Sequence, residues 1–324
     1  MIVSIFKRDF IAQYILFGIA AIVMWISPFV YPAPMIVMDS PAPLYNFFYI
    51  LFSEIPFLYV LIGFLLLLAQ SFWFKEILSK NDLFSRTSSF VGLVYFMLMS
   101  SSSSHQTLTP LIFSNFLIII ALGRIFAFYQ QSDALLDVFN CSFLLSLAGM
   151  FFLPSILLFP LIWLSFIVYR QFLWRDWLIS IIGLITPWLF LISFSYLNNS
   201  LMDILQQYTL YFQSLKLYFP PMLWSETLFY GIMGFFALPG FFLILRKLNE
   251  SPIAYRKRVN IIILFLLISI VLSLLGIKHF ENTEFLFLPL SYIVAVMIFE
   301  QKRGWMSEML FLIFIVSIVV KYYF

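Results

Sequence analysis

Charged residues, histidine and cysteine are scarce in this sequence. Lys, Arg, Asp and Glu make up 10% of its 324 residues, whereas they make up roughly one quarter of an average soluble domain. Cys141 is the only cysteine, and His105 and His279 are the only histidines. One cysteine excludes an internal disulfide and a thiolate metal centre, and two histidines exclude a metal centre built from several imidazoles. The sequence also lacks the Gly-rich phosphate loop of an ATP-driven pump.

Long apolar runs fill the gaps between the few charges. Hydrophobic residues make up 63% of the chain. A helix needs ~20 mainly apolar residues to cross a hydrocarbon core about 30 Å thick, and such runs recur from Ile11 to Val320. We therefore expect an all-α, polytopic transmembrane helical bundle that forms a single integral membrane domain over residues 1–324. The first run has no small-residue cleavage motif, so we expect it to remain as a span.

The hydropathy pattern predicts about eleven spans. Pro154 separates two of them by a short turn, so residues 136–169 could cross twice or form a re-entrant hairpin. The predicted spans are 11–30, 56–74, 88–104, 109–128, 136–153, 155–169, 178–197, 227–245, 259–277, 285–299 and 306–321.

The basic residues predict the orientation of these spans. If the N-terminus is cytoplasmic, 15 of the 18 Lys and Arg residues fall on the cytoplasmic side, and only Lys216, Lys278 and Lys321 fall outside. Cytoplasmic loops carry an excess of Lys and Arg, so we predict a cytoplasmic N-terminus and an outer C-terminus. The basic residues lie at helix ends and form no basic patch, which argues against a nucleic-acid partner and for membrane lipid.

Two predicted outer segments are rich in aromatic residues. Four prolines make residues 31–43 an expected ordered strap. Residues 44–54 have apolar side chains at helical spacing, which predicts an interfacial helix. The second segment, 198–226, is expected at the level of the lipid headgroups, a zone that Tyr and Trp favour.

Asp39 and Glu54 are the only carboxylates of the first outer loop. A carboxylate there could act as a general base on an acceptor hydroxyl, or bind a divalent cation on a phosphate. The structural alternative is that Asp39 begins a turn before Ser40 and Pro41, and that Glu54 ends a helix before Pro56.

The densest polar cluster on the predicted outer side precedes the tenth span. Its cations, Lys278 and His279, suit a lipid phosphate, and its carboxylates, Glu281 and Glu284, could contact a metal ion or an acceptor. The alternative is a solvated turn between two helices.

A few polar residues lie within the spans or end them. His105 follows a run of serines and could contact a metal ion or an acceptor, although packing of small polar residues between helices is the alternative. Arg124 and Asp137 are expected to pair across a short loop. No acidic residue is expected at the centre of a span, which disfavours an ion-coupled transporter.

Three blocks of sequence run from Phe84 to Ser101, from Leu111 to Phe126 and from Trp163 to Pro187. Together with the start at residues 1–7, they resemble an uncharacterised family of Phe-rich inner-membrane proteins from Bacteroidota. The likeness covers most of the chain. It implies a multi-pass protein of the bacterial inner membrane and no particular activity.

The order of elements is similar to that of type-C glycosyltransferases: one span, an outer loop with a carboxylate and an interfacial helix, then many short paired spans. This resemblance implies a sugar donor linked to polyprenyl phosphate at the outer face, with Asp39 as the base and Glu54 as the second candidate. Ser40 follows Asp39, so the paired acidic signature of that family is absent.

Three functions therefore remain open. The chain could be a lipid-linked glycan transferase or polymerase, a non-enzymatic membrane subunit or scaffold of a cell-envelope complex with membrane-protein partners, or a lipid or glycolipid transporter. A polar outer cavity would favour the first, a filled bundle with an apolar flank the second, and two cavities on opposite sides the third. A divalent cation is the one cofactor that the carboxylates suggest.

Overall fold

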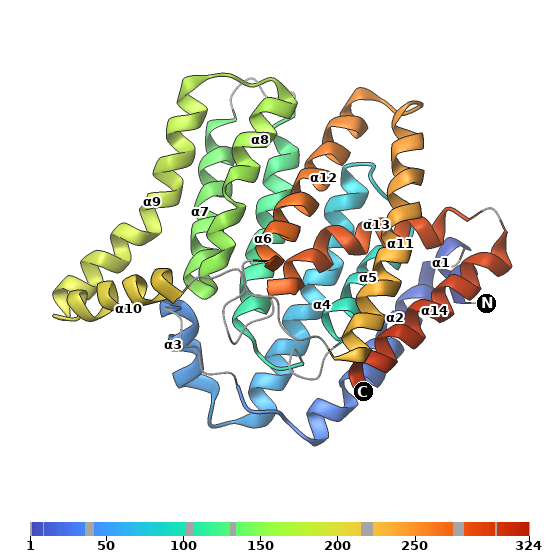
Figure 1. Cartoon of the computed structure of the whole chain (residues 1–324), viewed down its shortest axis with the longest axis horizontal. Coiled ribbons are helices and arrows are strands. Elements are labelled where there is room, and N and C mark those ends of the chain that lie inside the picture. The colour runs from blue at the N-terminus through green and yellow to red at the C-terminus, as the bar shows by residue number, and fades with distance from the viewer. Residues whose placement is uncertain are drawn as a thin grey trace.

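The structure is a computed structural model in which every described regular element is a helix (Figure 1). It describes residues 2–8, 10–35, 42–101, 106–129, 134–214, 223–274, 282–301 and 303–323, without the side chains of Arg8, Phe10, Ser214, Asn282 and Thr283. The helices are α1 (Ile2–Arg8), α2 (Phe10–Val30), α3 (Pro43–Phe52), α4 (Pro56–Lys80), α5 (Phe90–Met99), α6 (Pro110–Ala127), α7 (Leu135–Phe151), the 3₁₀ helix η2 (Leu153–Leu158), α8 (Pro160–Tyr169), α9 (Trp174–Leu197), α10 (Leu201–Ser214), α11 (Trp224–Leu248), α12 (Ile253–Leu274), the 3₁₀ helix η3 (Asn282–Leu286), α13 (Phe287–Phe299) and α14 (Gly304–Tyr323). The expected all-α bundle is confirmed.

Seven of the described helices are long and apolar enough to cross a membrane: α2, α4, α6, α9, α11, α12 and α14. They are the helices of a multi-pass membrane protein. The other predicted spans coincide with shorter apolar helices. The span predicted over 88–104, for example, contains only the 10 residues of α5. That helix ends at Met99, because the next residue, Ser100, begins a polar segment whose backbone takes other hydrogen-bond partners.

Proline marks where several of these helices begin. A proline at the first helical position loses no hydrogen bond, because that N–H has no partner within the helix, and its fixed φ suits the turn. At α6 the preceding residue, Thr109, also accepts a hydrogen bond from the backbone N–H of Ile112 (3.3 Å). The helices that begin in this way are α3 at Pro43, α4 at Pro56, α6 at Pro110 and α8 at Pro160.

The two short helices α5 and α13 form the centre of the bundle (Figure 1). All residues of α5, and all residues of α13 from Phe287 to Ile298, are buried. Glycines allow the neighbouring helices to come close. A Cβ atom on Gly92 would lie 2.7 Å from the carbonyl oxygen of Ser71, and one on Gly240 would lie 2.8 Å from that of Ile293. Small residues at helix contacts are typical of membrane bundles, and these two hold α5 against α4 and α11 against α13.

A buried glutamine of α2 contacts the chain just before α5. The Gln13 side chain is 1% exposed, and its Nε2 donates to the carbonyl oxygen of Thr87 (2.6 Å). Its Oε1 accepts from the backbone N–H of Ser89 (2.8 Å). The first span is therefore joined to the segment that leads into the central helix.

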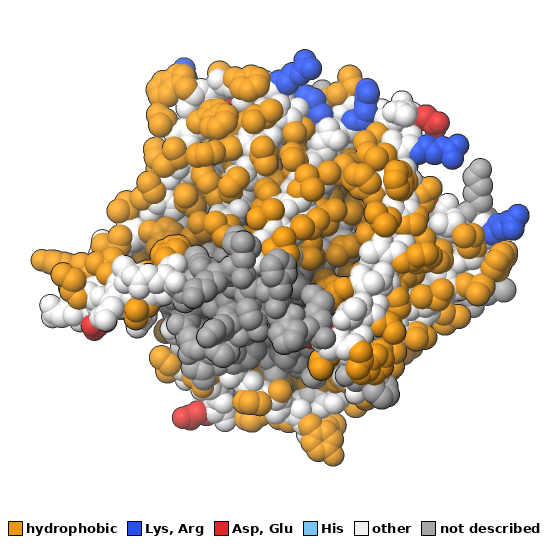
Figure 2. Space-filling model, viewed as in Figure 1, with side chains coloured by type: hydrophobic (Ala, Val, Ile, Leu, Met, Phe, Trp, Pro, Cys, Tyr) orange, Lys and Arg blue, Asp and Glu red, His pale blue; other side chains and the backbone are white. Residues whose placement is uncertain are grey.

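Basic side chains gather at one end of the bundle. Figure 2 shows Lys and Arg along one edge of the face in view and hydrophobic side chains over most of the rest. At this end Arg124 donates to Asp137 (3.0 Å), which confirms the predicted pair, and Lys247 pairs with Glu300. Exposed ion pairs contribute ~0–1 kcal/mol each, so these pairs indicate which helix ends lie together more than they stabilise the fold.

Helices α9 and α10 form an arm at the edge of the bundle (Figure 1). Much of α9 is exposed and apolar, and Pro187 lies inside this helix. The rings of Trp188 and Tyr208 meet edge to face with centroids 5.5 Å apart, above an apolar cavity of about 320 Å³ between α9, η2 and α10. The sequence predicted a segment at headgroup level here, and the structure adds that residues 201–214 of this segment form a helix, α10.

Candidate functional site

Two of the seven predicted site residues, Glu54 and Glu284, lie in the described part of the chain. The other five are outside the described residues: Asp39, His105, Lys278, His279 and Glu281. The site is therefore built from the two described carboxylates and from the side chains around them.

Glu54 is an exposed residue in the turn between α3 and α4. The predicted helix before it is confirmed as α3. The hydroxyl of Tyr45 in this helix donates to the carbonyl oxygen of Leu108 (3.3 Å), which holds α3 against the start of α6. Burial raises the pKa of Tyr45 above its usual value, because a phenolate would lose its hydration there. The phenol therefore keeps the proton that it donates.

Glu284 lies inside the protein. It belongs to η3, which packs against α12 and leads into the buried helix α13, and the residue is only 1% exposed. The sequence predicted Glu284 in a polar cluster on the outer side or in a solvated turn, and the structure shows the residue buried instead. The reason is that the 3₁₀ turn carries the chain inward instead of leaving it in a solvated loop.

A network of neutral polar side chains lies next to this carboxylate. Tyr95 of α5 interacts electrostatically with Glu284, and Nδ2 of the buried Asn115 in α6 donates to the sulfur of Met99 in α5 (3.7 Å). The Tyr95 hydroxyl donates to Oε1 of Gln70 in α4 (2.8 Å), and Nε2 of Gln70 donates to the carbonyl oxygen of Ile112 (2.8 Å). Helices α4, α5 and α6 therefore all supply hydrogen-bonding groups around the buried hydroxyl of Tyr95.

Buried charge is expensive in such an interior. Removing an ion from water costs several kcal/mol even after the protein relaxes, and ionisable residues inside membrane bundles usually mark substrate or ion pathways. Asp176, the other buried carboxylate among the described residues, lies in the first turn of α9, where the helix dipole favours an acid. Glu284 likewise lies in the first turn of its helix, the 3₁₀ helix η3, but it also interacts with the buried phenol of Tyr95, so it is the stronger candidate for a functional group.

Lys321, near the end of α14, is surrounded by three aromatic rings, an arrangement that we call the lysine cage. Nζ of Lys321, in the last turn of α14, lies 4.6 Å from the ring centroid of Phe229 and 5.3 Å from those of Tyr230 and Phe287. The same atom donates to the hydroxyl of Ser101 (3.4 Å). Because Phe287 follows η3 directly, the cage places a cation close to the segment that carries Glu284.

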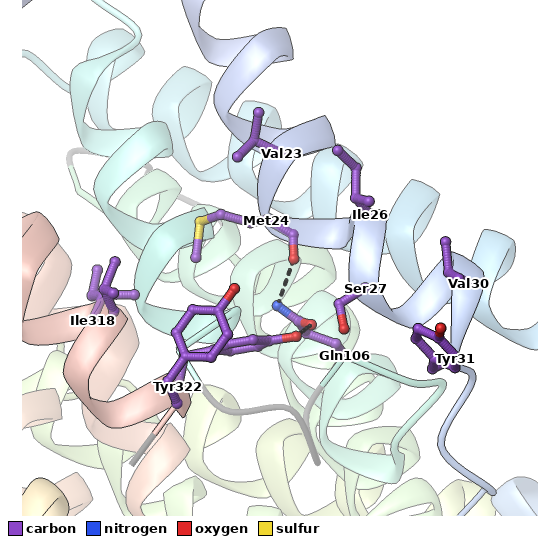
Figure 3. A pocket seen from close by; sticks show the side chains of 11 residues that line it. Val23, Met24, Ile26, Ser27, Val30, Tyr31, Gln106, Ile318 and Tyr322 are labelled. Carbon is purple, nitrogen blue, oxygen red and sulfur yellow. Dashed lines mark hydrogen bonds between the residues drawn. The ribbon is translucent and has the colours of Figure 1, made fainter.

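Tyr322, the next residue of α14, contacts Gln106, which follows α5 in the chain. The hydroxyl of Tyr322 donates to Oε1 of Gln106 (3.1 Å). Nε2 of Gln106 donates to the carbonyl oxygens of Met24 and Ser100 (3.0 Å each). Figure 3 shows Gln106 between Met24 and Tyr322. Lys321 and Tyr322 thus fix the two ends of the segment 101–106.

A cavity of about 370 Å³ opens above Gln106 between α2 and α14. Apolar side chains of both helices form most of its wall, and the polar groups are concentrated at one end: Ser27, Tyr31, Gln106 and Tyr322 (Figure 3). A groove that is apolar along its length and polar at one end suits an amphiphile, with an acyl or prenyl chain between the helices and a polar head beside Gln106.

Comparison with protein-family models, with curated proteins and with solved structures found no match. The arrangement also gives no ready metal centre, since no three His, Cys, Asp or Glu side chains of the described residues form a group that could hold an ion.

The sequence showed these residues without showing that they meet. Gln70 and Asn115 were visible only as neutral residues in apolar spans, Gln106 only as part of the polar stretch that ends the third predicted span, and Tyr95 had no distinguishing feature in the sequence. Lys321 did carry one, since it is one of the three basic residues that fall on the predicted outer side.

Proposed function

We propose that the protein is a transferase or polymerase that acts on a glycan linked to polyprenyl phosphate, at the outer face of a bacterial inner membrane. The observation that carries the proposal is the buried carboxylate of Glu284 beside Tyr95, close to the caged Lys321. The groove between α2 and α14 supports it, because a polyprenyl-linked sugar is an amphiphile of the kind that this groove suits.

The chemistry needs a base and a cation in one place. The base takes the proton of an acceptor hydroxyl, whose oxygen forms a bond to the anomeric carbon of the donor sugar. The bond between that carbon and the phosphate oxygen breaks, and polyprenyl phosphate leaves with the electron pair beside a cation. Asp39 is the proposed base, with Glu54 as the second candidate, and Lys278 and His279 bind the phosphate.

The remaining groups position the acceptor. Glu284 contacts the acceptor hydroxyl, directly or through a divalent cation, and Glu281 and His105 are proposed for the same role. Lys321 adds positive charge to this end of the chain. A carboxylate in low-dielectric surroundings attracts a cation or a hydroxyl more strongly than one in water, which is the advantage of burying Glu284.

The proposal includes about eleven membrane-embedded helical segments, with a cytoplasmic N-terminus and an outer C-terminus. The contacts support this order. Residues assigned to the cytoplasm contact one another, as in the pairs Lys247–Glu300 and Arg124–Asp137. A residue assigned to the outer side, Lys321, contacts Ser101.

The test is transfer of a labelled sugar from a polyprenyl-phosphate donor in proteoliposomes that hold the full-length protein. Asp39→Asn and Glu284→Gln should each lower the rate by about 10²–10⁴-fold, the usual contribution of such a group. Asp203→Asn, which changes an exposed carboxylate of α10, should leave the rate unchanged. Wild-type rates for both Asp39→Asn and Glu284→Gln would refute the proposal.

A second function is favoured by a different observation. The centre of the bundle is filled by α5 and α13, and the arm of α9 and α10 exposes apolar side chains next to an apolar cavity. These features suit a membrane subunit or scaffold that binds another membrane protein through the arm. If this function is correct, Phe190→Ser and Phe194→Ser on the exposed face of α9 should release a co-purifying partner, whereas Glu284→Gln should retain it.

A further inference from the structure

Two adjacent cations share one aromatic ring at the basic end of the bundle. Nζ of Lys257 lies 5.2 Å, and the guanidinium carbon of Arg258 5.8 Å, from the ring centroid of Tyr129. Lys257 also lies 6.0 Å from the ring of Tyr169 and donates to its carbonyl oxygen (3.4 Å). The start of α12 and the ends of α6 and α8 therefore converge on two positive charges.

These cations have no carboxylate partner in the described part of the chain, where every ion pair joins other residues. Nη1 of Arg258 donates to the backbone carbonyl of Asn81 (3.1 Å), which is a neutral acceptor. By contrast, Arg124 and Lys247 at the same end each pair with a carboxylate. Two like charges on one ring repel each other, and an anion beside both would offset this repulsion.

Hydrogen-bond donors at this place also lack acceptors. Tyr169 is 6% exposed, and its hydroxyl has no hydrogen-bond partner among the described residues. Nε of Arg258 is buried and equally lacks one, and its charge acts on the Tyr169 phenol. Leaving a buried donor without an acceptor costs about 1–3 kcal/mol, and native proteins rarely leave several such donors together. An acceptor with several oxygen atoms and a negative charge would satisfy all of them.

We propose that this cluster, formed by Tyr129, Tyr169, Lys257 and Arg258, binds the phosphate of an anionic phospholipid. The proposal is independent of the function proposed above. Ile167, which is 52% exposed, and Phe172, which is 67% exposed, precede and follow Tyr169 in the chain, so apolar surface for acyl chains is present at this end of α8. Basic pockets between the ends of transmembrane helices bind anionic headgroups in this way, and the N-terminal part of α12 adds the favourable end of a helix dipole.

The test uses the purified full-length protein in a neutral detergent, titrated with short-chain phosphatidylglycerol or phosphatidylcholine and followed by native mass spectrometry. We expect phosphatidylglycerol to bind at least tenfold more tightly than phosphatidylcholine. Arg258→Gln should weaken that binding by about tenfold or more, because hydrogen bonds to charged groups are the stronger ones. Tyr169→Phe, which removes one hydroxyl and leaves the packing intact, should weaken it about fivefold.

The matched control is Arg86→Gln, which removes an exposed arginine that pairs with Asp82 and should leave phosphatidylglycerol binding unchanged. Inorganic phosphate is titrated in a parallel arm. If only phosphatidylglycerol binds, the site recognises the phosphate as part of a lipid. If inorganic phosphate binds as well, the site recognises the phosphate group itself. Both results support the phosphate site. Equal binding of the two lipids without phosphate binding, or equal losses in Arg86→Gln and Arg258→Gln, would overturn it.

Discussion

The close approach of α5 to α4 gives the sharpest prediction about packing. In Gly92→Ala the new methyl group would lie 2.7 Å from the carbonyl oxygen of Ser71, where ordinary contacts begin at 3.4 Å. The obstructing atom belongs to the backbone of α4, so the helices must move apart by several tenths of an ångström. Overpacking of this kind costs about 1–3 kcal/mol.

A matched variant separates this contact from the helix propensity of alanine, which favours both substitutions by up to ~1 kcal/mol. Gly18→Ala also changes a glycine within a helix, but its new methyl group would meet no atom within 4 Å. The difference between the two variants therefore isolates the contact. At roughly 2–4 °C per kcal/mol, Gly92→Ala should unfold about 2–12 °C below Gly18→Ala.

The assay is thermal unfolding of the purified protein in one detergent, followed by tryptophan fluorescence. The same displacement should weaken the hydrogen bond between Tyr95 and Gln70, because Tyr95 lies one turn beyond Gly92 and Gln70 precedes Ser71. If the proposed function is correct, sugar transfer should therefore fall together with stability. Equal melting temperatures for the two variants would show that α5 and α4 are not packed as described.

Three further predictions concern the site and the topology. Lys321→Met should lower the melting temperature by a few degrees, since a desolvated cation–π contact contributes up to ~2 kcal/mol, and Lys321→Arg should restore it; an unchanged temperature in Lys321→Met would argue against the cage. Gln106→Leu should destabilise more than Tyr322→Phe, because it leaves two backbone carbonyls and a hydroxyl without partners at about 1–3 kcal/mol each, and the reverse order in thermal unfolding would contradict the role given to Gln106. Reporter fusions after Lys80 should show a cytoplasmic location and fusions after Asn199 an outer one, and a reversed signal at either position would refute the orientation.

Local signals in the sequence were enough to predict most helices. A proline in the first turn and a long apolar run predict α4 and α6. Both signals can be read from residues that are adjacent in the sequence. The pair of Arg124 and Asp137 was predictable for the same reason, since only a short loop separates the two helices. The helix α10 was missed because its polar residues, among them Asp203 and Gln206, are as typical of a solvated loop as of an amphipathic helix.

The candidate site could not be predicted in the same way. The contacts of Lys321 with Ser101 and of Tyr322 with Gln106 join residues more than 200 positions apart, and no local pattern encodes such a distance. The position of Glu284 was predicted wrongly because its neighbours in sequence are polar, whereas its neighbours in space are the buried helices. Local polarity indicates a loop, and tertiary packing decides whether that loop faces water.

The shortness of α5 has a consequence for how the protein assembles. Ten helical residues are about 15 Å long, half the thickness of the hydrocarbon core, and the residues that flank α5, Ser89 and Ser100, are buried, so the backbone groups at both ends need partners within the protein. Side chains from other segments serve them instead: Gln13 accepts from Ser89 before the helix, and Gln106 donates to Ser100 after it. The central helix is therefore expected to become stable in the membrane together with α2 and the segment that carries Gln106, rather than as an independent span.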